Sequence, residues 1–213
     1  MTGVGRFITL EGGEGAGKST QARLLAETLA GWGLPVLCTR EPGGSPGAER
    51  LRGLLLSGEI DWSPQAETLL HFAARAEHVA KTIRPALAVG TWVVCDRFYD
   101  STMAYQGHGQ GADRHLIRAQ IELLGIRPDL TLVLDVSDRV AKQRLSLRGG
   151  DADRYEREDR AFHTRVNDAF RAIAAAEPDR CRVIRADGTE TEVREAILRA
   201  IRTAFAADLP PAS

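Results

Sequence analysis

Apolar residues occur along this chain in two alternating patterns, short unbroken runs and longer stretches with helical spacing. Unbroken runs are typical of strands that are buried on both faces of a sheet. They predict five strands, at residues 6–11, 35–39, 92–95, 130–136 and 181–185. Apolar residues spaced three and four positions apart predict helices. These lie near residues 18–30, 46–57, 64–89, 99–105, 113–124, 138–147, 161–176 and 190–206.

Strands that alternate with helices indicate an α/β fold, in which helices cover both faces of a parallel sheet. We therefore expect a doubly wound parallel sheet of about five strands flanked by helices. A chain of 213 residues has the usual size of one domain, so we interpret residues 1–213 as a single unit. Residues 148–160 differ from the rest because they are mostly charged residues and glycine, and we interpret them as a short mobile lid.

The composition argues against several kinds of partner. The 28 basic and 29 acidic residues give a formal charge of −1, whereas proteins that bind a nucleic-acid polymer usually carry a basic surplus. The apolar run between Pro85 and Asp96 is too short for a membrane span, which needs about 20 residues. Residues 1–10 show no secretory signal, and the three cysteines form no Cys-x-x-Cys pair. We therefore expect a cytoplasmic protein that binds neither a nucleic-acid polymer nor a membrane.

A glycine-rich motif connects the first predicted strand to the first predicted helix. Residues 12–19 fit G-x-x-x-x-G-K-[ST], the phosphate-binding loop of P-loop NTPases. Glycine lets backbone N–H groups approach phosphate oxygens closely, and the following helix adds its partial positive end. Lys18 is expected to reach the β and γ phosphates, and Ser19 to bind Mg²⁺. The predicted ATP-binding residues of the loop are Gly12, Gly13, Glu14, Gly15, Ala16, Gly17, Lys18, Ser19 and Thr20.

The loop alone leaves the class of P-loop protein open. A GTPase would normally carry Asn-Lys-x-Asp for guanine, but none of the three lysines, Lys18, Lys81 and Lys142, follows an asparagine. A lid that closes over two substrates excludes water, which a kinase needs in order to avoid hydrolysing ATP. The charged segment 148–160 therefore favours a small-molecule kinase over a motor or a transporter subunit.

Several further motifs occur in a characteristic order along the chain. They are Ile8-Thr9-Leu10-Glu11-Gly12, Thr39-Arg40-Glu41-Pro42-Gly43-Gly44, Phe72-Ala73-Ala74-Arg75, Asp96-Arg97, Ser101-Thr102-Met103-Ala104-Tyr105-Gln106-Gly107, Leu134-Asp135-Val136 and Asp153-Arg154-Tyr155-Glu156. Their order and spacing resemble the thymidylate kinase family over nearly the whole chain. The resemblance implies a homodimer that phosphorylates dTMP to dTDP with ATP and Mg²⁺. Direct in-line transfer would need no covalent intermediate on the enzyme.

The resemblance also implies where the catalytic cations come from. Glu14 and Gly15 stand in the loop where some members of the family carry an arginine. The sequence is therefore similar to the bacterial subtype whose lid donates the cations, which would here be Arg148 and Arg154. Together with Lys18 they are expected to stabilise the charge on the phosphoryl group during transfer.

The acceptor phosphate is expected at the end of the third predicted strand. Asp96 and Arg97 follow this buried strand, which puts a carboxylate near Mg²⁺ and a guanidinium near the acceptor phosphate. Arg40 is a weaker candidate for the same phosphate, and Arg52 is weaker still. Glu14 would repel phosphates, and the resemblance implies that it accepts a hydrogen bond from the 3′-hydroxyl of deoxyribose instead.

The predicted base site departs from the family pattern. Family members stack an aromatic residue on thymine and use an arginine four residues later for the ring, but here His71 lies four residues before Arg75 and Phe72 lies three before it. Either side chain could stack, and we favour Phe72 because its ring has the larger apolar face. Other contacts implied by the resemblance are Ser101 and Thr102 at the base edge, and Tyr105 and Gln106 beside the sugar, where Tyr105 selects deoxyribose.

The donor base has the least specific prediction. The adenine is expected near the turn at residues 185–188, with Arg144 stacked on it. Two alternatives to a thymidylate kinase stay open at this point. One is another nucleoside or nucleoside monophosphate kinase with the same loop, and the other is a nucleotide-dependent switch that shows no acceptor-stimulated turnover.

Overall fold

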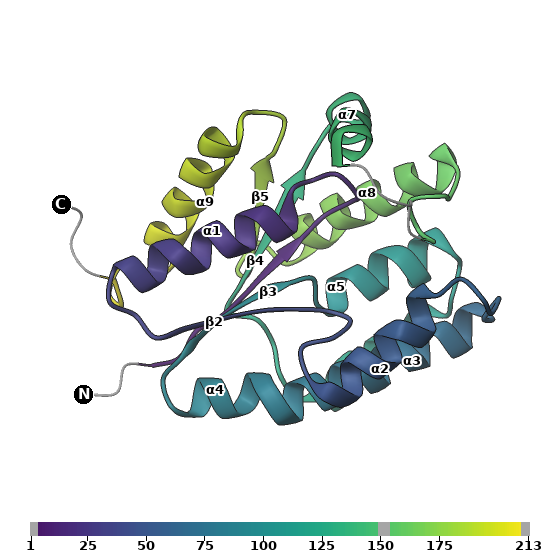
Figure 1. Cartoon of the computed structure of the whole chain (residues 1–213), viewed down its shortest axis with the longest axis horizontal. Helices are drawn as coiled ribbons and strands as arrows, with labels where there is room; N and C mark the ends of the chain where they lie inside the picture. Colours follow the sequence, from purple (N-terminus) through teal and green to yellow (C-terminus); the bar gives the residue numbers. More distant parts are fainter. Residues whose placement is uncertain (1–3, 149–153, 210–213) are drawn as a thin grey trace.

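The computed structural model describes residues 4–148 and 154–209, apart from the side chain of Arg148. Within these residues, five strands form one sheet in the order β2-β3-β1-β4-β5, and every neighbouring pair is parallel (Figure 1). The strands are β1 (Phe7–Glu11), β2 (Val36–Arg40), β3 (Trp92–Asp96), β4 (Leu130–Asp135) and β5 (Cys181–Arg185). The predicted α/β fold with five parallel strands is thereby confirmed.

Helices follow the predicted stretches closely. The α-helices are α1 (Lys18–Gly31), α2 (Pro46–Leu56), α3 (Pro64–His78), α4 (Arg84–Ala88), α5 (Tyr99–Thr102), α6 (Arg114–Leu124), α7 (Asp138–Arg148), α8 (Arg160–Ala176) and α9 (Glu190–Ala204). Two π-helical segments, η1 (Val79–Ile83) and η2 (Met103–Gly109), join α3 to α4 and extend α5. Single π-helical turns inside helices often occur at functional sites, which directs attention to η2.

Side-chain caps explain where several helices begin. Ser45 and Ser63 each precede a proline in the first turn, and each hydroxyl accepts a hydrogen bond from a backbone N–H of that turn. Asp159 caps α8 in the same way, and Thr189 and Glu192 form a reciprocal capping box at α9. These polar side chains satisfy N–H groups that have no partner inside the helix.

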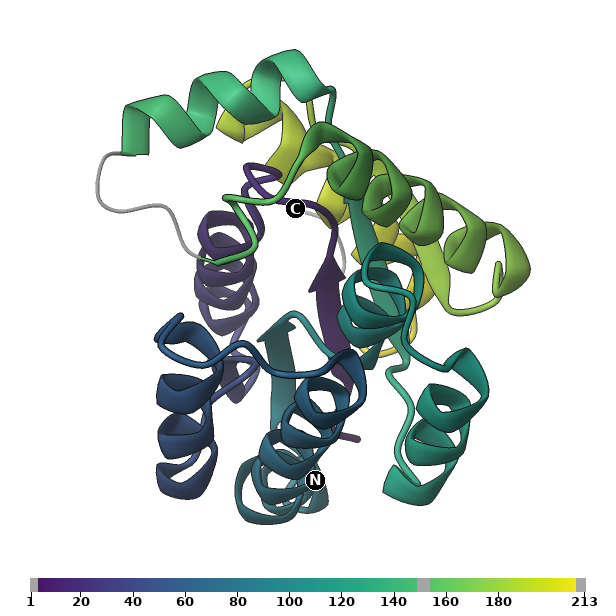
Figure 2. The ribbon, with the colours of Figure 1, turned by 90° about the vertical axis from the view of Figure 1, so that its right-hand side faces the viewer.

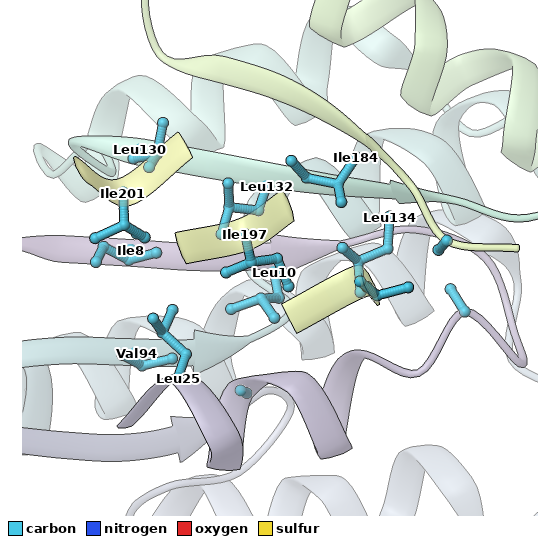
Figure 3. Close-up of a cluster of buried hydrophobic side chains, with 14 of the residues drawn as sticks. Ile8, Leu10, Leu25, Val94, Leu130, Leu132, Leu134, Ile184, Ile197 and Ile201 are labelled. Atoms are coloured by element: carbon cyan, nitrogen blue, oxygen red, sulfur yellow. The ribbon is translucent and has the colours of Figure 1, made fainter. Parts of the chain in front are cut away.

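The sheet separates two apolar layers. Side chains alternate between the faces of a strand, so Ile8 and Leu10 of β1 face one layer while Phe7 faces the other. The first layer is covered by α1 and α9, whose Leu25 and Ile197 pack against the strands (Figure 3). Apolar residues of α3, η1, α6 and α8 cover the opposite face. The strands are therefore buried on both sides, as their unbroken apolar runs predict.

The carboxyl ends of the strands carry the functional loops. The loop after β1 lies between α7 on one side and α2 and α3 on the other (Figure 2). Parallel α/β sheets bind ligands at this edge, where the loops leave the strands. Among the residues that the structure describes, no helix is both long and apolar enough to cross a membrane.

Candidate active site

A cavity of about 540 Å³ opens at this edge of the sheet. Its wall includes the phosphate loop, the turn after β2, the buried face of α3, the α5–η2 segment, and residues of α7 and α9. The same cavity therefore reaches from the phosphate-binding loop to the buried face of α3.

The phosphate loop has the geometry that its glycines predict. Gly12, Gly15 and Gly17 all have positive φ angles, of 137°, 71° and 89°. A Cβ atom at Gly12 or Gly15 would lie within 2.6 Å of a backbone carbonyl oxygen. No side chain caps the start of α1 at Lys18, so its first backbone N–H groups are available to an anion. The loop thus presents a cradle of N–H donors.

Lys18 is buried at the centre of this cradle. Its ammonium group donates a hydrogen bond to the carbonyl of Gly13 at 2.7 Å. Burial and the nearby guanidinium of Arg97 lower the pKa of Lys18 to about 8. A bound phosphate would favour the charged ammonium group, because opposite charges stabilise each other in a buried site.

Ser19 and Asp96 come together at the mouth of the loop. The hydroxyl of Ser19 donates a hydrogen bond to Oδ2 of Asp96, while Oδ1 of Asp96 is buried and has no hydrogen-bond partner among the described residues. Hydroxyl and carboxylate oxygens are the ligands that Mg²⁺ prefers, and Mg²⁺ usually takes only one or two carboxylates in addition to phosphates and water. The pair that the sequence predicts for Mg²⁺ therefore fits that ion.

Glu14, Arg97 and Tyr105 form a compact polar cluster. Arg97 and Tyr105 donate hydrogen bonds to Oε1 of Glu14 at 2.5 and 2.7 Å, and the guanidinium lies 4.8 Å from the centre of the Tyr105 ring. Burial alone would raise the pKa of Glu14, but Arg97, Lys18 and Tyr105 lower it to about 2. Glu14 is therefore ionised and directed at a cation, which explains how a carboxylate is tolerated in a phosphate loop.

The backbone of Arg97 is strained. Its φ of 71° is the only positive value at a non-glycine residue within the described ranges 4–148 and 154–209. Its guanidinium also donates to the carbonyl of Gly12 and to Ser101, both at 3.2 Å. Strained residues cluster at functional sites, because the surrounding structure must hold them in place. The position expected to bind the acceptor phosphate therefore has an unusual and well-supported geometry.

At the end of the cavity near α3, the structure favours His71 over Phe72 as the side chain that reaches the base. Phe72 is 4% exposed and packs with Phe7 and Val93 in the core, whereas His71 lies on the cavity wall. Successive helical residues differ in direction by about 100°, so the face that carries Arg75 into the cavity carries His71 and turns Phe72 into the core. Four-residue spacing, and not ring size, decides which side chain reaches the cavity.

A hydrogen-bond network fixes His71 in place. Tyr155 donates to Oε1 of Glu67 at 2.7 Å, so the oxygen of Tyr155 is the acceptor for Nε2 of His71, which lies 2.9 Å away. Burial and the guanidinium of Arg75 lower the pKa of His71 to about 3, so its ring is neutral at neutral pH. Gln106 also donates to Glu67 and Tyr155, at 2.9 and 3.1 Å.

Arg154 lies in a different place from the one predicted. Its guanidinium forms an ion pair with Oε2 of Glu67 at 2.8 Å, at the base end of the cavity. Glu67 is fully buried on α3, and a buried carboxylate needs a cation or several donors. In this arrangement Arg154 anchors the segment before α8 and does not reach the phosphate loop. The side chain of Arg148 lies outside the described residues, so its catalytic role stays a prediction.

The remaining predicted residues line the cavity, and several of them also make hydrogen bonds or ion pairs within the protein. Arg40 and Arg52 line the cavity, but Arg40 is paired with Glu49 at 3.2 Å and Arg52 donates to the carbonyl of Pro42 at 2.7 Å. Thr102 is buried on the wall. The hydroxyl of Ser101 donates to the buried Glu11 at 2.6 Å and is therefore a structural contact as well as a candidate contact for the base.

At the donor end, Arg144 bridges two parts of the wall. It donates to the carbonyl of Gly188 at 2.8 Å and lies 3.4 and 3.5 Å from the carbonyls of Gly15 and Ala16. It thereby connects the phosphate loop to the turn predicted near adenine. The sequence did not predict several other residues of the cavity wall. They lie outside the motifs, or in motifs to which no role was given for them, and they are Gln21, Glu41, Leu56, Leu145, Tyr155, Glu190 and Val193.

A phosphate loop, an adjoining carboxylate and a cavity that continues from them to α3 are the features of a P-loop kinase for a small nucleotide acceptor. The sequence profile of the family described as thymidylate kinase matches residues 10–197. A thymidylate kinase of Gluconobacter oxydans is 54% identical over 205 residues, covering 94% of this chain and 96% of that protein. One of Rhizorhabdus wittichii is 54% identical over 211 residues, covering 97% and 99%.

Solved structures agree with this result. A crystal structure of thymidylate kinase from Ehrlichia chaffeensis superposes with a TM-score of 0.77 at 37% sequence identity, covering 93% of this chain and 98% of that chain. The chain belongs to the thymidylate kinase family. It is therefore a kinase with nucleotide substrates and ATP as phosphoryl donor.

Proposed function

We propose that the protein transfers the γ-phosphoryl group of ATP directly to the 5′-phosphate of dTMP, and so produces dTDP and ADP in the cytoplasm. The bond between the γ phosphorus and the β–γ bridging oxygen breaks while an oxygen of the acceptor phosphate forms the new bond. The observation that carries the proposal is the single cavity that runs from Lys18 in the phosphate loop to Arg75 and His71 under α3. The wall at its loop end suits a polyphosphate, and the wall at α3 suits a base.

In this proposal the phosphate end does the chemistry. Backbone N–H groups of the loop and Lys18 hold the β and γ phosphates, and Arg97 holds the acceptor phosphate within reach. Ser19 and Asp96 would hold Mg²⁺, which neutralises charge on the phosphates when bound. The orphaned Oδ1 of Asp96 supports this assignment, because a metal ion would satisfy it.

The other end selects the acceptor. Glu14 accepts the 3′-hydroxyl of deoxyribose, Tyr105 forms the wall beside C2′, and His71 presents a neutral ring to the base. Arg75 offers a guanidinium hydrogen to a carbonyl oxygen of the pyrimidine. The neutral state of His71 supports its role, because an uncharged ring loses less hydration when a base covers it.

We also propose that the whole chain acts as one unit and pairs as a homodimer through helix faces between residues 64 and 124. The exposed apolar side chains of Leu69 on α3 and Leu123 on α6 support this, at 43% and 81% exposure. Light scattering after size-exclusion chromatography would give twice the chain mass of 23.2 kDa, and a monomer mass would contradict the homodimer.

The test of the proposed function is ADP production from ATP with dTMP, dUMP, UMP, CMP, GMP and AMP as acceptors. We expect the highest kcat/KM with dTMP, and we expect a chelator to abolish turnover and Mg²⁺ to restore it. Higher kcat/KM with another monophosphate would identify a different nucleoside monophosphate kinase. Nucleotide binding with no acceptor-stimulated turnover would identify a switch.

A further inference from the structure

The turn after β2 carries a motif, residues 39–44, that phosphoryl transfer leaves without a role. At its centre lies Glu41, whose side chain is 2% exposed. Oε2 of Glu41 accepts a hydrogen bond from Nε of Arg75 at 2.6 Å, and Oε1 lies 3.0 Å from Nδ1 of His78. Each oxygen of this buried carboxylate therefore has its own partner, as a buried charge requires.

The hydrogen bonds continue beyond Glu41. His78 is fully buried, and its Nε2 lies 2.8 Å from the hydroxyl of Thr39. A carboxylate only accepts hydrogen bonds, so Nδ1 of His78 must carry a hydrogen towards Glu41. In the neutral ring Nε2 then accepts from Thr39. The four side chains Thr39, His78, Glu41 and Arg75 form one chain of hydrogen bonds, which we call the Glu41 relay.

Arg75 is held on nearly every side. In addition to Glu41, its Nη2 donates to the carbonyl of Phe98 at 3.1 Å, and its guanidinium lies 4.9 Å from the ring centre of Phe72. Nη1 is different, because it is buried and has no hydrogen-bond partner among the described residues. Arg75 also lines the cavity. Since an unsatisfied buried donor is costly, a ligand that offers an oxygen to Nη1 is favoured.

The glycines of the motif provide an independent connection to the relay. Gly44 has a φ of 82°, and a Cβ atom there would lie 2.3 Å from Nε2 of His78 and 2.5 Å from the hydroxyl of Thr39. The carbonyl of the same glycine accepts a hydrogen bond from Thr82 at 2.8 Å. Only glycine leaves space for His78 at this point of the turn. The motif thus encodes a turn that is shaped around the relay.

We propose that Thr39, Glu41 and His78 are positioning residues, which hold Arg75 so that Nη1 meets a ring carbonyl of the acceptor pyrimidine. This inference rests on the proposed function and assigns a role to residues outside it. Because Nη1 would contact the base and not the moving phosphoryl group, the contact is equally strong in the ground state and the transition state. Loss of the relay should therefore raise the KM for the acceptor and leave kcat nearly unchanged.

The test is a double-mutant cycle between Glu41→Gln and Arg75→Ala, with steady-state kinetics for both substrates. The amide NH₂ of glutamine is a donor, so it would face either Nε of Arg75 or Nδ1 of His78, which are donors themselves, and one hydrogen bond of the relay would be lost. We expect Glu41→Gln to raise the KM for dTMP by about 10- to 100-fold, the range for a lost charged hydrogen bond. The kcat and the KM for ATP should stay within about threefold, and Glu41→Gln should add almost nothing in the Arg75→Ala background.

Further variants separate positioning from general stability. His78→Asn keeps an N–H donor at the same number of bonds from Cα as Nδ1, so we expect a smaller rise in the KM for dTMP than His78→Ala gives. Thr39→Val removes only the last hydroxyl and should give the smallest rise. As a matched control, Glu27→Gln breaks an exposed ion pair of the same 2.6 Å length, with Arg23, and should leave all constants unchanged.

Several outcomes would overturn the inference. Additive effects of Glu41→Gln and Arg75→Ala would show that the two act separately. A lower kcat, similar rises in the KM for dTMP and the KM for ATP, and a lower Tm would together show that the carboxylate of Glu41 has only a structural role. If Glu41→Gln does not fold, an unchanged KM for dTMP in both Thr39→Val and His78→Ala contradicts the relay. If the wild type prefers another pyrimidine monophosphate, the proposed function is wrong, and the same cycle with that acceptor tests the relay.

Discussion

The two ends of the cavity are built in different ways. The cradle for the donor phosphates comes from one continuous segment, residues 12–20, whose path depends on glycines with positive φ, and Asp96 and Arg97 at the end of β3 are added to it from elsewhere in the chain. The base end joins side chains that are distant in the chain, since Glu41 and Arg75 are 34 residues apart and Glu67 and Tyr155 are 88 residues apart. Phosphate recognition, which many enzymes share, can be encoded locally, whereas selection of one acceptor base depends on tertiary contacts.

The two ends also treat charge differently. At the phosphate end Lys18 donates to a backbone carbonyl and Glu14 is paired with Arg97 on the cavity wall, whereas at the base end the carboxylates of Glu41 and Glu67 are almost fully buried and each is paired with an arginine. The ammonium group of Lys18 is therefore available to a phosphate and contributes to the reaction more than to folding. A buried ion pair that loses one partner leaves an uncompensated charge in the protein. Substitutions should therefore affect turnover at one end, and acceptor affinity and stability at the other.

The largest effect is expected for Lys18→Ala. The variant removes the cation next to the β and γ phosphates, and losses of such cations reduce phosphoryl transfer by about 10³-fold or more. The fold should remain, because within residues 4–148 and 154–209 the side chain of Lys18 makes one hydrogen bond, to the loop backbone. The measurement is kcat for ADP production together with Tm, with the exposed Lys81→Ala as control. Near-normal kcat in a folded variant would refute the role of the loop.

Arg154→Ala tests whether this arginine belongs to the base end. Removal of one partner of a buried ion pair costs about 3 kcal/mol, so we expect a clear loss in the free energy of unfolding and a higher KM for dTMP. The kcat should fall less than the KM rises. Denaturant unfolding and steady-state kinetics give both quantities. A large fall in kcat with an unchanged KM for dTMP would restore the catalytic role that the sequence predicts.

A pair of variants at Tyr105 tests the wall beside the sugar. Tyr105→Ala should reduce the preference for dTMP over its ribose analogue by about 1–3 kcal/mol, because the ring that blocks a 2′-hydroxyl is gone. Tyr105→Phe keeps the ring and loses the two hydrogen bonds of the hydroxyl, to Glu14 and from Arg97, so it should keep the preference and raise the KM for dTMP about fivefold. Equal preferences in all three proteins would show that Tyr105 does not face C2′.

A further prediction concerns the pH dependence of stability, whose effect is small within any single pH unit. Burial and the charge of Asp100 raise the pKa of Glu11 from 4.5 to about 8. Across this window the folded protein keeps a proton that the unfolded chain releases, so the free energy of unfolding falls as the pH rises. Glu11→Gln should remove up to about 1.4 kcal/mol of this fall per pH unit, measured by urea unfolding from pH 5 to 8. Parallel pH profiles for both proteins would contradict the raised pKa.

Sequence reasoning was most successful where structure is local. The five strands follow from unbroken apolar runs, and the hydroxyl of Ser19 donates a hydrogen bond to Asp96, the other residue that the motifs predict for Mg²⁺. The choice of Phe72 over His71 failed because ring size was weighed above helical spacing. Glu41 and His78 could not be assigned roles, since no pattern in one sequence reveals that residues 37 positions apart share a hydrogen bond.

The most direct test of this division between the two ends is a calorimetric titration of Lys18→Ala with dTMP. If the phosphate end performs the chemistry and the base end selects the acceptor, the variant lacks turnover but binds dTMP within about threefold of the wild-type affinity. A loss of dTMP binding that matches the loss of turnover would contradict the account, because recognition of the acceptor would then depend on Lys18 as well.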